Sequence, residues 1–147
     1  MSVLNTILGT LKSGLETITV DNGYNTTVVN VFDYPISITN LPTGDQPCLV
    51  MLVDEDARLT VYGSDGRRFD ITVSVTGKVH SDRSTVQVDT MDLLTDVKDY
   101  IDGVTASDLG SGCLDISWQA DGAEILRDQA AFTIDLTIIY FAAKGSN

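Results

Sequence analysis

Histidine and clustered acidic residues are the side chains of this sequence whose types are suited to chemistry. His80 is the only histidine, and Ser81 and Asp82 follow it directly. A Ser-His-Asp triad requires three groups that converge in space, which adjacent residues in a polar turn do not achieve. We therefore expect His80 to be an exposed loop residue, and the sequence predicts no catalytic residue.

The acidic clusters are candidates for binding a hard cation. The run at residues 54–56 is the densest, and carboxylate oxygens are ligands that such cations prefer. It lacks the glycine and the ligand spacing of an EF-hand loop, so a solvated turn is the favoured interpretation. Asp92, Asp96 and Asp99 have the spacing of one helix face, which without a histidine or a second acidic helix is typical of a wet surface. The sequence thus predicts no metal site.

Phosphate-binding loops are absent from the sequence. Neither Gly-x-x-x-x-Gly-Lys-Ser/Thr nor Gly-x-Gly-x-x-Gly occurs, and in these loops backbone N–H groups cradle phosphates. The chain has nine basic and 21 acidic residues, a net charge of -12, which is opposite in sign to a surface that binds a phosphate backbone. We expect no nucleotide cofactor and no affinity for nucleic acid.

The local excess of basic residues lies at one predicted hairpin. The dipeptide at 65–66, Asp-Gly, is the strongest short hairpin signal, and two arginines follow it, with Lys78 and Arg83 nearby. Such arginines either solubilise an exposed hairpin or meet an acidic neighbour. We predict a subunit or partner interface that includes Asp65, Gly66, Arg67 and Arg68.

Cysteine and aromatic residues lie mainly in predicted strands. Cys48 and Cys113 are inside apolar runs, which favours buried free thiols over a disulfide or a metal pair. Trp118 and Tyr140 also lie in apolar strands, and each is a candidate for the core or for an interface.

Two amphipathic helices are predicted to support these residues. In the first, over residues 3–18, apolar residues recur at three- and four-residue steps, Ser2 is the candidate N-cap, and residues 21–23 supply the stop. The second is predicted over residues 90–102, capped by Asp89 and ended by Gly103. Its inward-facing residues are predicted to be Leu93, Leu94, Val97, Tyr100 and Ile101.

Apolar and alternating segments predict the strands. They cover residues 26–32, 48–53, 58–62, 69–79, 113–120 and 131–141, with an irregular stretch at 33–47 and a turn at Asp121-Gly122. Along the segment 69–79 apolar and polar residues alternate, which gives this hairpin arm one polar face. The arm is long enough to project beyond the body of a small domain.

The order of the elements is a helix, several strands, a second helix and two more strands. It predicts an α+β domain with a mainly antiparallel β-sheet, two α-helices packed on one face and a projecting β-hairpin. The length fits one domain spanning residues 1–147, and a hydrophobic fraction of 43% is ordinary for a folded chain. No apolar run approaches the ~20 residues that span a bilayer, and the N-terminus lacks the basic flank of a signal peptide. We expect a protein made in the cytoplasm, with no membrane partner.

Three segments near the N-terminus, and the order of the elements after them, form a pattern. The segments are Leu11-Lys-Ser-Gly-Leu-Glu-Thr-Ile18, Asn22-Gly-Tyr-Asn-Thr26 and Val28-Val-Asn-Val31. An apolar strand led by Pro47, a hairpin, the helix near 93–101 and the strand 131–140 follow. The pattern resembles the tail terminator, or tail-completion, proteins of long-tailed viruses of bacteria and archaea. It spans nearly the whole chain, which departs from the family by its unusual acidity.

This resemblance implies a structural subunit of the virion rather than an enzyme. Proteins of this family form a ring, typically a hexamer, at the head-proximal end of the tail. The ring stops polymerisation of the tail tube, so its implied partners are further copies of the chain, the major tail tube protein and a neck or head-completion protein. DNA would pass through the lumen without specific binding.

Two other functions fit the same residues. A neck or head-completion protein of the same virion would share the size and general architecture and differ in what it touches. A cellular small-ligand-binding module would use the concave face of the sheet as a pocket. An enzyme is the least favoured function, since no catalytic constellation is found.

Overall fold

Helix α1 (Val3–Leu15) is the first element of the computed structural model, which describes residues 2–37, 41, 44, 46–53, 58–62, 66–126 and 130–143. The hydroxyl of Ser2 accepts a hydrogen bond from the Asn5 N–H at 3.1 Å, so the predicted N-cap is confirmed. The helix ends three residues before the predicted end. A 3-10 turn, η1 (Val20–Asn22), follows and ends at Gly23, which is in the left-handed conformation.

Helix α2 (Val86–Gly103) begins one turn earlier than predicted. The N–H groups of Thr85 and Val86 both donate to the Asp82 carbonyl at 2.9 Å, and this turn leads directly into the helix. Thr85 is therefore the N-cap, and Asp89 lies in the first turn, so the prediction that Asp89 caps the helix is wrong. The predicted end at Gly103 is confirmed.

Six strands form one sheet with the order β1-β2-β4-β6-β5, and β3 pairs with β4 beside this path. The strands are β1 (Asn30–Phe32), β2 (Cys48–Val53), β3 (Arg58–Tyr62), β4 (Gly66–Lys78), β5 (Cys113–Leu126) and β6 (Ala131–Ala143). Only the β1–β2 pair among these is parallel. The expected α+β architecture with a mainly antiparallel sheet is thus confirmed.

Two strands differ from their predicted bounds. Strand β1 is confined to three residues within the predicted 26–32. Strand β5 continues through Asp121-Gly122, so the turn predicted there is wrong. Its pairing shifts instead: Trp118 is opposite Leu136 and Ala123 is opposite Ile134, so five steps on β5 match two on β6. The extra residues of the Asp-Gly segment are accommodated as a bulge within a strand that stays paired on both sides.

The predicted hairpin forms between β3 and β4, and β4 also pairs with β6 along its whole length. Strands β2 and β3 lie end to end on the other flank of β4, since β2 pairs with residues 73–78 and β3 with residues 67–70. Because the hairpin arm is part of the main sheet throughout, its projection from the domain is not confirmed.

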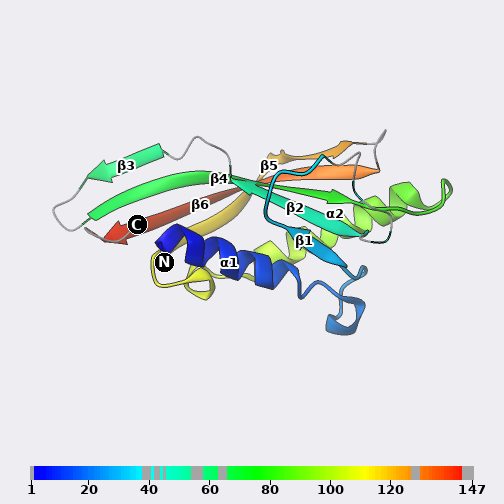
Figure 1. Ribbon diagram of the computed structural model, residues 1–147, viewed down its shortest axis with the longest axis horizontal. Helices are drawn as coiled ribbons and strands as arrows, with labels where there is room; N and C mark the ends of the chain where they lie inside the picture. The colour runs from blue at the N-terminus through cyan, green and yellow to red at the C-terminus, as the bar shows by residue number, and fades with distance from the viewer. Residues whose placement is uncertain are drawn as a thin grey trace.

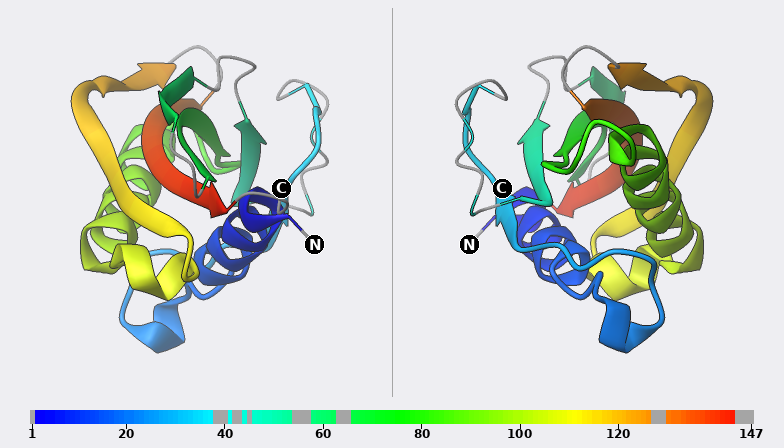
Figure 2. Two further views of the ribbon diagram at one scale, coloured as in Figure 1. Left: turned by 90° about the vertical axis from the view of Figure 1, so that its left-hand side faces the viewer. Right: turned by 90° about the vertical axis from the view of Figure 1, so that its right-hand side faces the viewer.

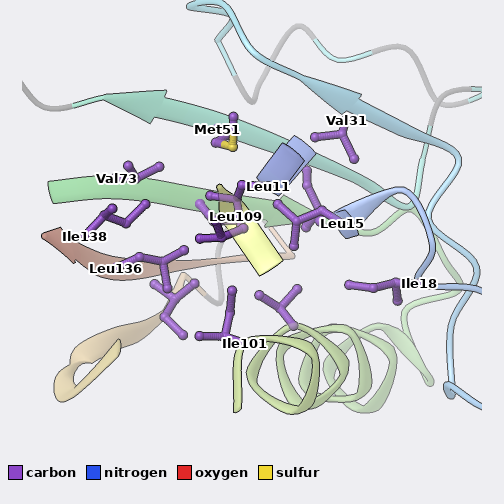
Figure 3. Packing of buried hydrophobic residues seen from close by; sticks show 14 of the residues in the cluster. Leu11, Leu15, Ile18, Val31, Met51, Val73, Ile101, Leu109, Leu136 and Ile138 are labelled. Atoms are coloured by element: carbon purple, nitrogen blue, oxygen red, sulfur yellow. The ribbon is translucent and has the colours of Figure 1, made fainter. Parts of the chain in front are cut away.

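Both helices pack on one face of the curved sheet, as Figure 2 shows, and the core lies between the two layers. Alternate residues Ile71, Val73 and Val75 of β4 face Ile138, Leu136 and Ile134 of β6, and all six are buried. Figure 3 shows side chains of both layers pointing into the same space: Val73, Leu136 and Ile138 from the strands, and Leu11, Leu15 and Ile101 from the helices. The helical and strand periodicities read from the sequence therefore meet in one core.

The opposite face of the central strands is polar. The Ser74 hydroxyl donates to the Asp135 carboxylate at 2.9 Å, and the hydroxyls of Thr76 and Thr133 are hydrogen-bonded at 3.2 Å. Beside these pairs a smaller apolar cluster covers β2, formed by Leu41, Cys48 and Val50 with Phe32, Ile36 and Leu52. One face of the sheet thus packs against the helices, and the other combines hydrogen-bonded polar pairs on the central strands with an apolar cluster over β2.

Candidate interaction surface

The predicted interface residues lie at the start of β4. Arg67 and Arg68 are exposed, Gly66 is buried, and Asp65 lies outside the described residues. Adjacent residues of a strand point to opposite faces, so Arg67 shares a face with Phe69 while Arg68 is on the other face. The structure therefore places a guanidinium group on each side of the strand rather than two groups on one surface.

Strand β3, residues 66–70 of β4 and residues 139–143 of β6 form what we call the three-stranded end of the sheet, which β5 reaches only at Ile139 and Tyr140. Figure 1 shows it on the left, beyond the start of α1. On its helix-side face the rings of Phe69 and Tyr140 are stacked, with centroids 5.2 Å apart and planes at 21°. Burial raises the pKa of the Tyr140 hydroxyl. Arg67 thus lies beside an aromatic pair, a combination frequent at protein interfaces.

Gly66 is required where it stands because the neighbouring backbone approaches closely. A Cβ at this position would lie 2.3 Å from the Ala142 carbonyl oxygen and 2.9 Å from the Cα of Ala143. Both neighbours are backbone atoms of β6 and cannot move aside without breaking the pairing. The glycine predicted from the hairpin signal therefore has a second role, which is the packing of β4 against β6.

Lys78 and Arg83 are not near the arginine pair. Lys78 is at the far end of β4, where it pairs with Ala131, whereas Arg67 pairs with Ala142. Eleven residue steps along β4 separate Arg67 from Lys78, a strand length of about 36 Å. The prediction that these four residues form one basic region is wrong, because an extended strand separates residues that are close in sequence.

A groove between the end of α2 and β5 was not predicted from the sequence. It has a volume of about 450 Å³ and is lined by Ile101, Asp102, Val104, Ile116, Ser117 and Trp118. The indole N–H of Trp118 donates to the Asp102 carboxylate at 3.0 Å, and the Lys98 ammonium lies 4.8 Å from the centre of its ring. Trp118 is half-buried while Tyr140 is buried, so only the second of these two aromatics belongs to the core.

Asp96 is buried, with an exposed fraction of 1%, so its predicted place on the wet face of the second helix is wrong. Its carboxylate accepts hydrogen bonds from the backbone N–H of Asn25 at 3.1 Å, the side-chain amide of Asn25 at 3.1 Å and the backbone N–H of Thr26 at 2.8 Å. Asp99 is exposed, as predicted. The buried carboxylate is a structural tie between α2 and the loop before β1.

The remaining candidate groups are dispersed. His80 is exposed, as expected for a loop residue, and the acidic run at 54–56 lies outside the described residues. Among the residues that the structure describes, no group of three or more His, Cys, Asp or Glu side chains is placed to hold a metal ion. Cys48 and Cys113 are buried free thiols, as predicted, and burial raises the pKa of Cys113.

Comparison with known proteins assigns no family or function to this surface. None of the helices in the described part of the chain is both long and apolar enough to cross a bilayer. Comparison with protein-family models and with curated proteins finds no match. The interaction surface therefore has to be interpreted from its own residues.

Proposed function

We propose that this chain is a structural protein of a virion, whose copies form a ring that caps the tail tube, ends its polymerisation and joins the tail to the head or neck. The proposal rests on the resemblance to tail terminator proteins in the N-terminal segments and in the order of elements. A sheet with two helices on one face is compatible with it. Its work would be assembly rather than catalysis.

The observation that carries the proposal is the three-stranded end with its exposed arginines. In a chain of net charge -12, exposed Arg67 presents positive charge on the face that carries the stacked pair of Phe69 and Tyr140, and exposed Arg68 presents it on the opposite face. Interfaces are enriched in arginine and aromatic residues, and a few such residues carry most of the binding energy. This end therefore has the composition of a contact with another acidic molecule, and another copy of the chain is one.

The charge of the chain also suits a ring through which DNA passes. A path for moving DNA should not hold phosphates by the salt-sensitive attraction that lysine and arginine create. A ring of copies with net charge -12 each would have a neutral or acidic lumen if its few basic residues lie in the contacts between subunits.

The direct experiment is to measure the mass of the purified protein by light scattering and to image it by electron microscopy. We expect a closed ring with cyclic symmetry, and a ring that blocks elongation when added to growing tubes of its major tail tube protein. A strictly monomeric protein at high concentration in every salt would contradict the ring.

The same assay separates the proposal from its nearest alternative, a neck or head-completion protein. A terminator ring binds the end of the tail tube and stops its growth. A neck protein would leave tube growth unchanged and would bind the head side of the completed tail instead.

A further inference from the structure

The connection between α1 and β1 contains Asn22-Gly23, the only Asn-Gly pair in the sequence. Asn22 is the last residue of the η1 turn, Gly23 ends this turn in the left-handed conformation, and both residues are exposed. Figure 2 shows η1 as the blue coil that projects below the two helices. An asparagine side chain reacts most readily with the backbone when glycine follows it, because glycine has no Cβ to shield its nitrogen. The pair is therefore a reactive sequence on an open surface.

The reaction is an intramolecular attack that releases ammonia. The backbone nitrogen of Gly23 forms a bond with the side-chain carbonyl carbon of Asn22, and the side-chain nitrogen leaves as ammonia together with the proton of the Gly23 N–H. Water then opens the cyclic imide at either carbonyl group, which gives an aspartate or an isoaspartate whose backbone contains one more carbon. The attack requires a free Gly23 N–H and an Asn22 side chain that can rotate onto it.

The η1 turn occupies both groups that the reaction needs. The Gly23 N–H donates to the Val20 carbonyl at 3.0 Å, so the attacking nitrogen is hydrogen-bonded. The side-chain amide of Asn22 donates to the Thr17 carbonyl at 2.7 Å, which fixes the side chain that has to rotate. The backbone N–H of Asn22 donates to the Thr19 hydroxyl at 3.2 Å, and this bond caps the turn. Ring closure also needs the Asn22 Cβ and the Gly23 nitrogen to be eclipsed about the Cα–C bond, which the backbone of a 3-10 turn does not allow.

We propose that Asn22 is a latent deamidation site, which the closed η1 turn protects and which reacts when this turn opens. The rate in the native protein is then the rate in the unfolded chain multiplied by the fraction of molecules whose turn is open. Every contact involved lies within one chain, so this site does not depend on the proposed assembly function.

The product of the reaction cannot restore the turn. A carboxylate has no N–H to donate to the Thr17 carbonyl, so two oxygens would face each other where the 2.7 Å hydrogen bond was. The same connection continues to Asn25 and Thr26, whose backbone N–H groups bind the buried carboxylate of Asp96. Deamidation would therefore loosen the segment that ties α2 to the loop before β1, and a converted chain would be a permanent record that the turn had opened.

The first test compares the rate of deamidation in the native and in the denatured chain at the same mildly alkaline pH and temperature. Peptide mapping by mass spectrometry after timed incubation measures the fraction of Asn22 that has become either product. We expect the native chain to convert at least about tenfold more slowly than the chain in denaturant. Equal rates would show that the turn gives no protection, and a lack of conversion in denaturant would show that the pair is unreactive. Either result would overturn the inference.

A substitution in the turn tests whether η1 itself gives the protection. Thr19→Ala removes the capping hydroxyl and should raise the native rate about fivefold, because the turn opens more easily without its cap. Thr10→Ala is the matched control, since the Thr10 hydroxyl donates to the Thr6 carbonyl at 2.9 Å within α1. The control should convert at the rate of the unaltered chain. In denaturant all three chains should convert at one rate, because their Asn-Gly sequence is the same. Equal native rates for the two variants would contradict protection by the turn.

The effect of the product is tested by Asn22→Asp, which should lower the melting midpoint by roughly 2–5 °C. Asn5→Asp adds the same charge in the first turn of α1, where the helix dipole favours an acidic group, and should not lower the midpoint. Circular dichroism measures both transitions. If Asn22→Asp melts at the temperature of the unaltered chain, the carboxylate is accommodated in the turn and the proposed loosening is wrong.

Discussion

At the scale of single residues, the buried carboxylate of Asp96 shows where sequence patterns stop being informative. Its spacing from Asp92 and Asp99 is that of one helix face, and neighbours of the same type predict a wet surface. Its hydrogen-bond donors are Asn25 and Thr26, about seventy residues away in sequence. No local sequence pattern predicts such partners, because only the tertiary fold brings Asn25 and Thr26 next to Asp96.

Replacing Asp96 with asparagine should lower the free energy of unfolding by about 1–3 kcal/mol, because an amide cannot accept all the hydrogen bonds of the carboxylate. Chemical denaturation monitored by circular dichroism measures the change. Asp99→Asn, at an exposed position of the same helix, is the matched control and should change the free energy by less than about 0.5 kcal/mol. Equal effects of the two substitutions on the free energy of unfolding would contradict the structural role given to Asp96.

The two thiols should be unreactive in the folded protein. Cys48 has an exposed fraction of 0% and Cys113 of 6%, and burial raises the pKa of Cys113, so little of its thiolate forms near pH 8. A disulfide reagent that releases a coloured thiolate should react with both groups rapidly in denaturant and only slowly in native buffer. Rapid reaction of one thiol per chain in native buffer would mean that this thiol is accessible in the folded protein.

At the scale of elements, the sequence predicts which segments are helices and strands better than where they end. The apolar spacing of α1 and α2 and the alternation of β4 are confirmed, since these patterns reflect one buried face of a regular element. The early start of α2 and the continuation of β5 through Asp121-Gly122 were missed. Pairing with β6 extends β5 across residues that favour a turn in isolation, whereas α2 begins early because the local turn at Asp82 leads directly into it.

The candidate interaction surface also contains residues that a local sequence pattern predicts and residues that only the tertiary structure brings together. Gly66, Arg67 and Arg68 could be singled out by a local hairpin signal. The groove at Trp118 could not, because it joins a helix end to a strand of the sheet edge through one hydrogen bond. The only local trace of it is a tryptophan in an apolar strand, which fits the core equally well.

The contact between α1 and α2 depends on a glycine. A Cβ at Gly14 would lie 1.6 Å from the Tyr100 hydroxyl oxygen and 2.4 Å from its ring, so the two helices meet where a side chain is missing. Gly14→Ala should therefore lower the free energy of unfolding by about 1–3 kcal/mol, which thermal and chemical denaturation would measure.

Gly9 provides the control for this substitution within the same helix. It is exposed and has no heavy atom within 4 Å of its ideal Cβ, so Gly9→Ala should stabilise the protein by up to about 1 kcal/mol through helix propensity alone. Opposite signs at the two glycines are the expected result. Stabilisation at both would show that the helices do not meet at Gly14.

At the scale of the whole molecule, the net charge of each copy opposes the association that the proposed contact surface favours. Each copy has a net charge of -12, and the basic residues proposed to join copies are few. Long-range repulsion acts over a Debye length of about 30 Å at 0.01 M salt and about 8 Å at 0.15 M, whereas a partly buried ion pair is screened much less. Salt should therefore weaken the repulsion between copies more than it weakens the contact.

We accordingly expect the assembled fraction to rise as sodium chloride increases from about 0.01 M to 0.15 M, and the ring to loosen at low salt. Light scattering at constant protein concentration across the salt series measures it. The opposite trend, a ring that dissociates steadily as salt is added, would mean that attraction between unlike charges dominates the whole surface.

The place of β6 in the sheet also determines when the protein can fold during its synthesis. Strand β6 follows every other described element along the chain, yet it lies between β4 and β5 and contributes many of the fully buried side chains. Until the ribosome has released it, β5 has no partner strand and one flank of β4 is open. The nascent chain therefore has to keep its apolar strands apart, alone or on a chaperone, while α2 and β5 are translated. A chain interrupted before β6 would lack the buried side chains of β6 and one of the three strands of the three-stranded end, so a truncated copy cannot be incorporated into an assembly that depends on that surface.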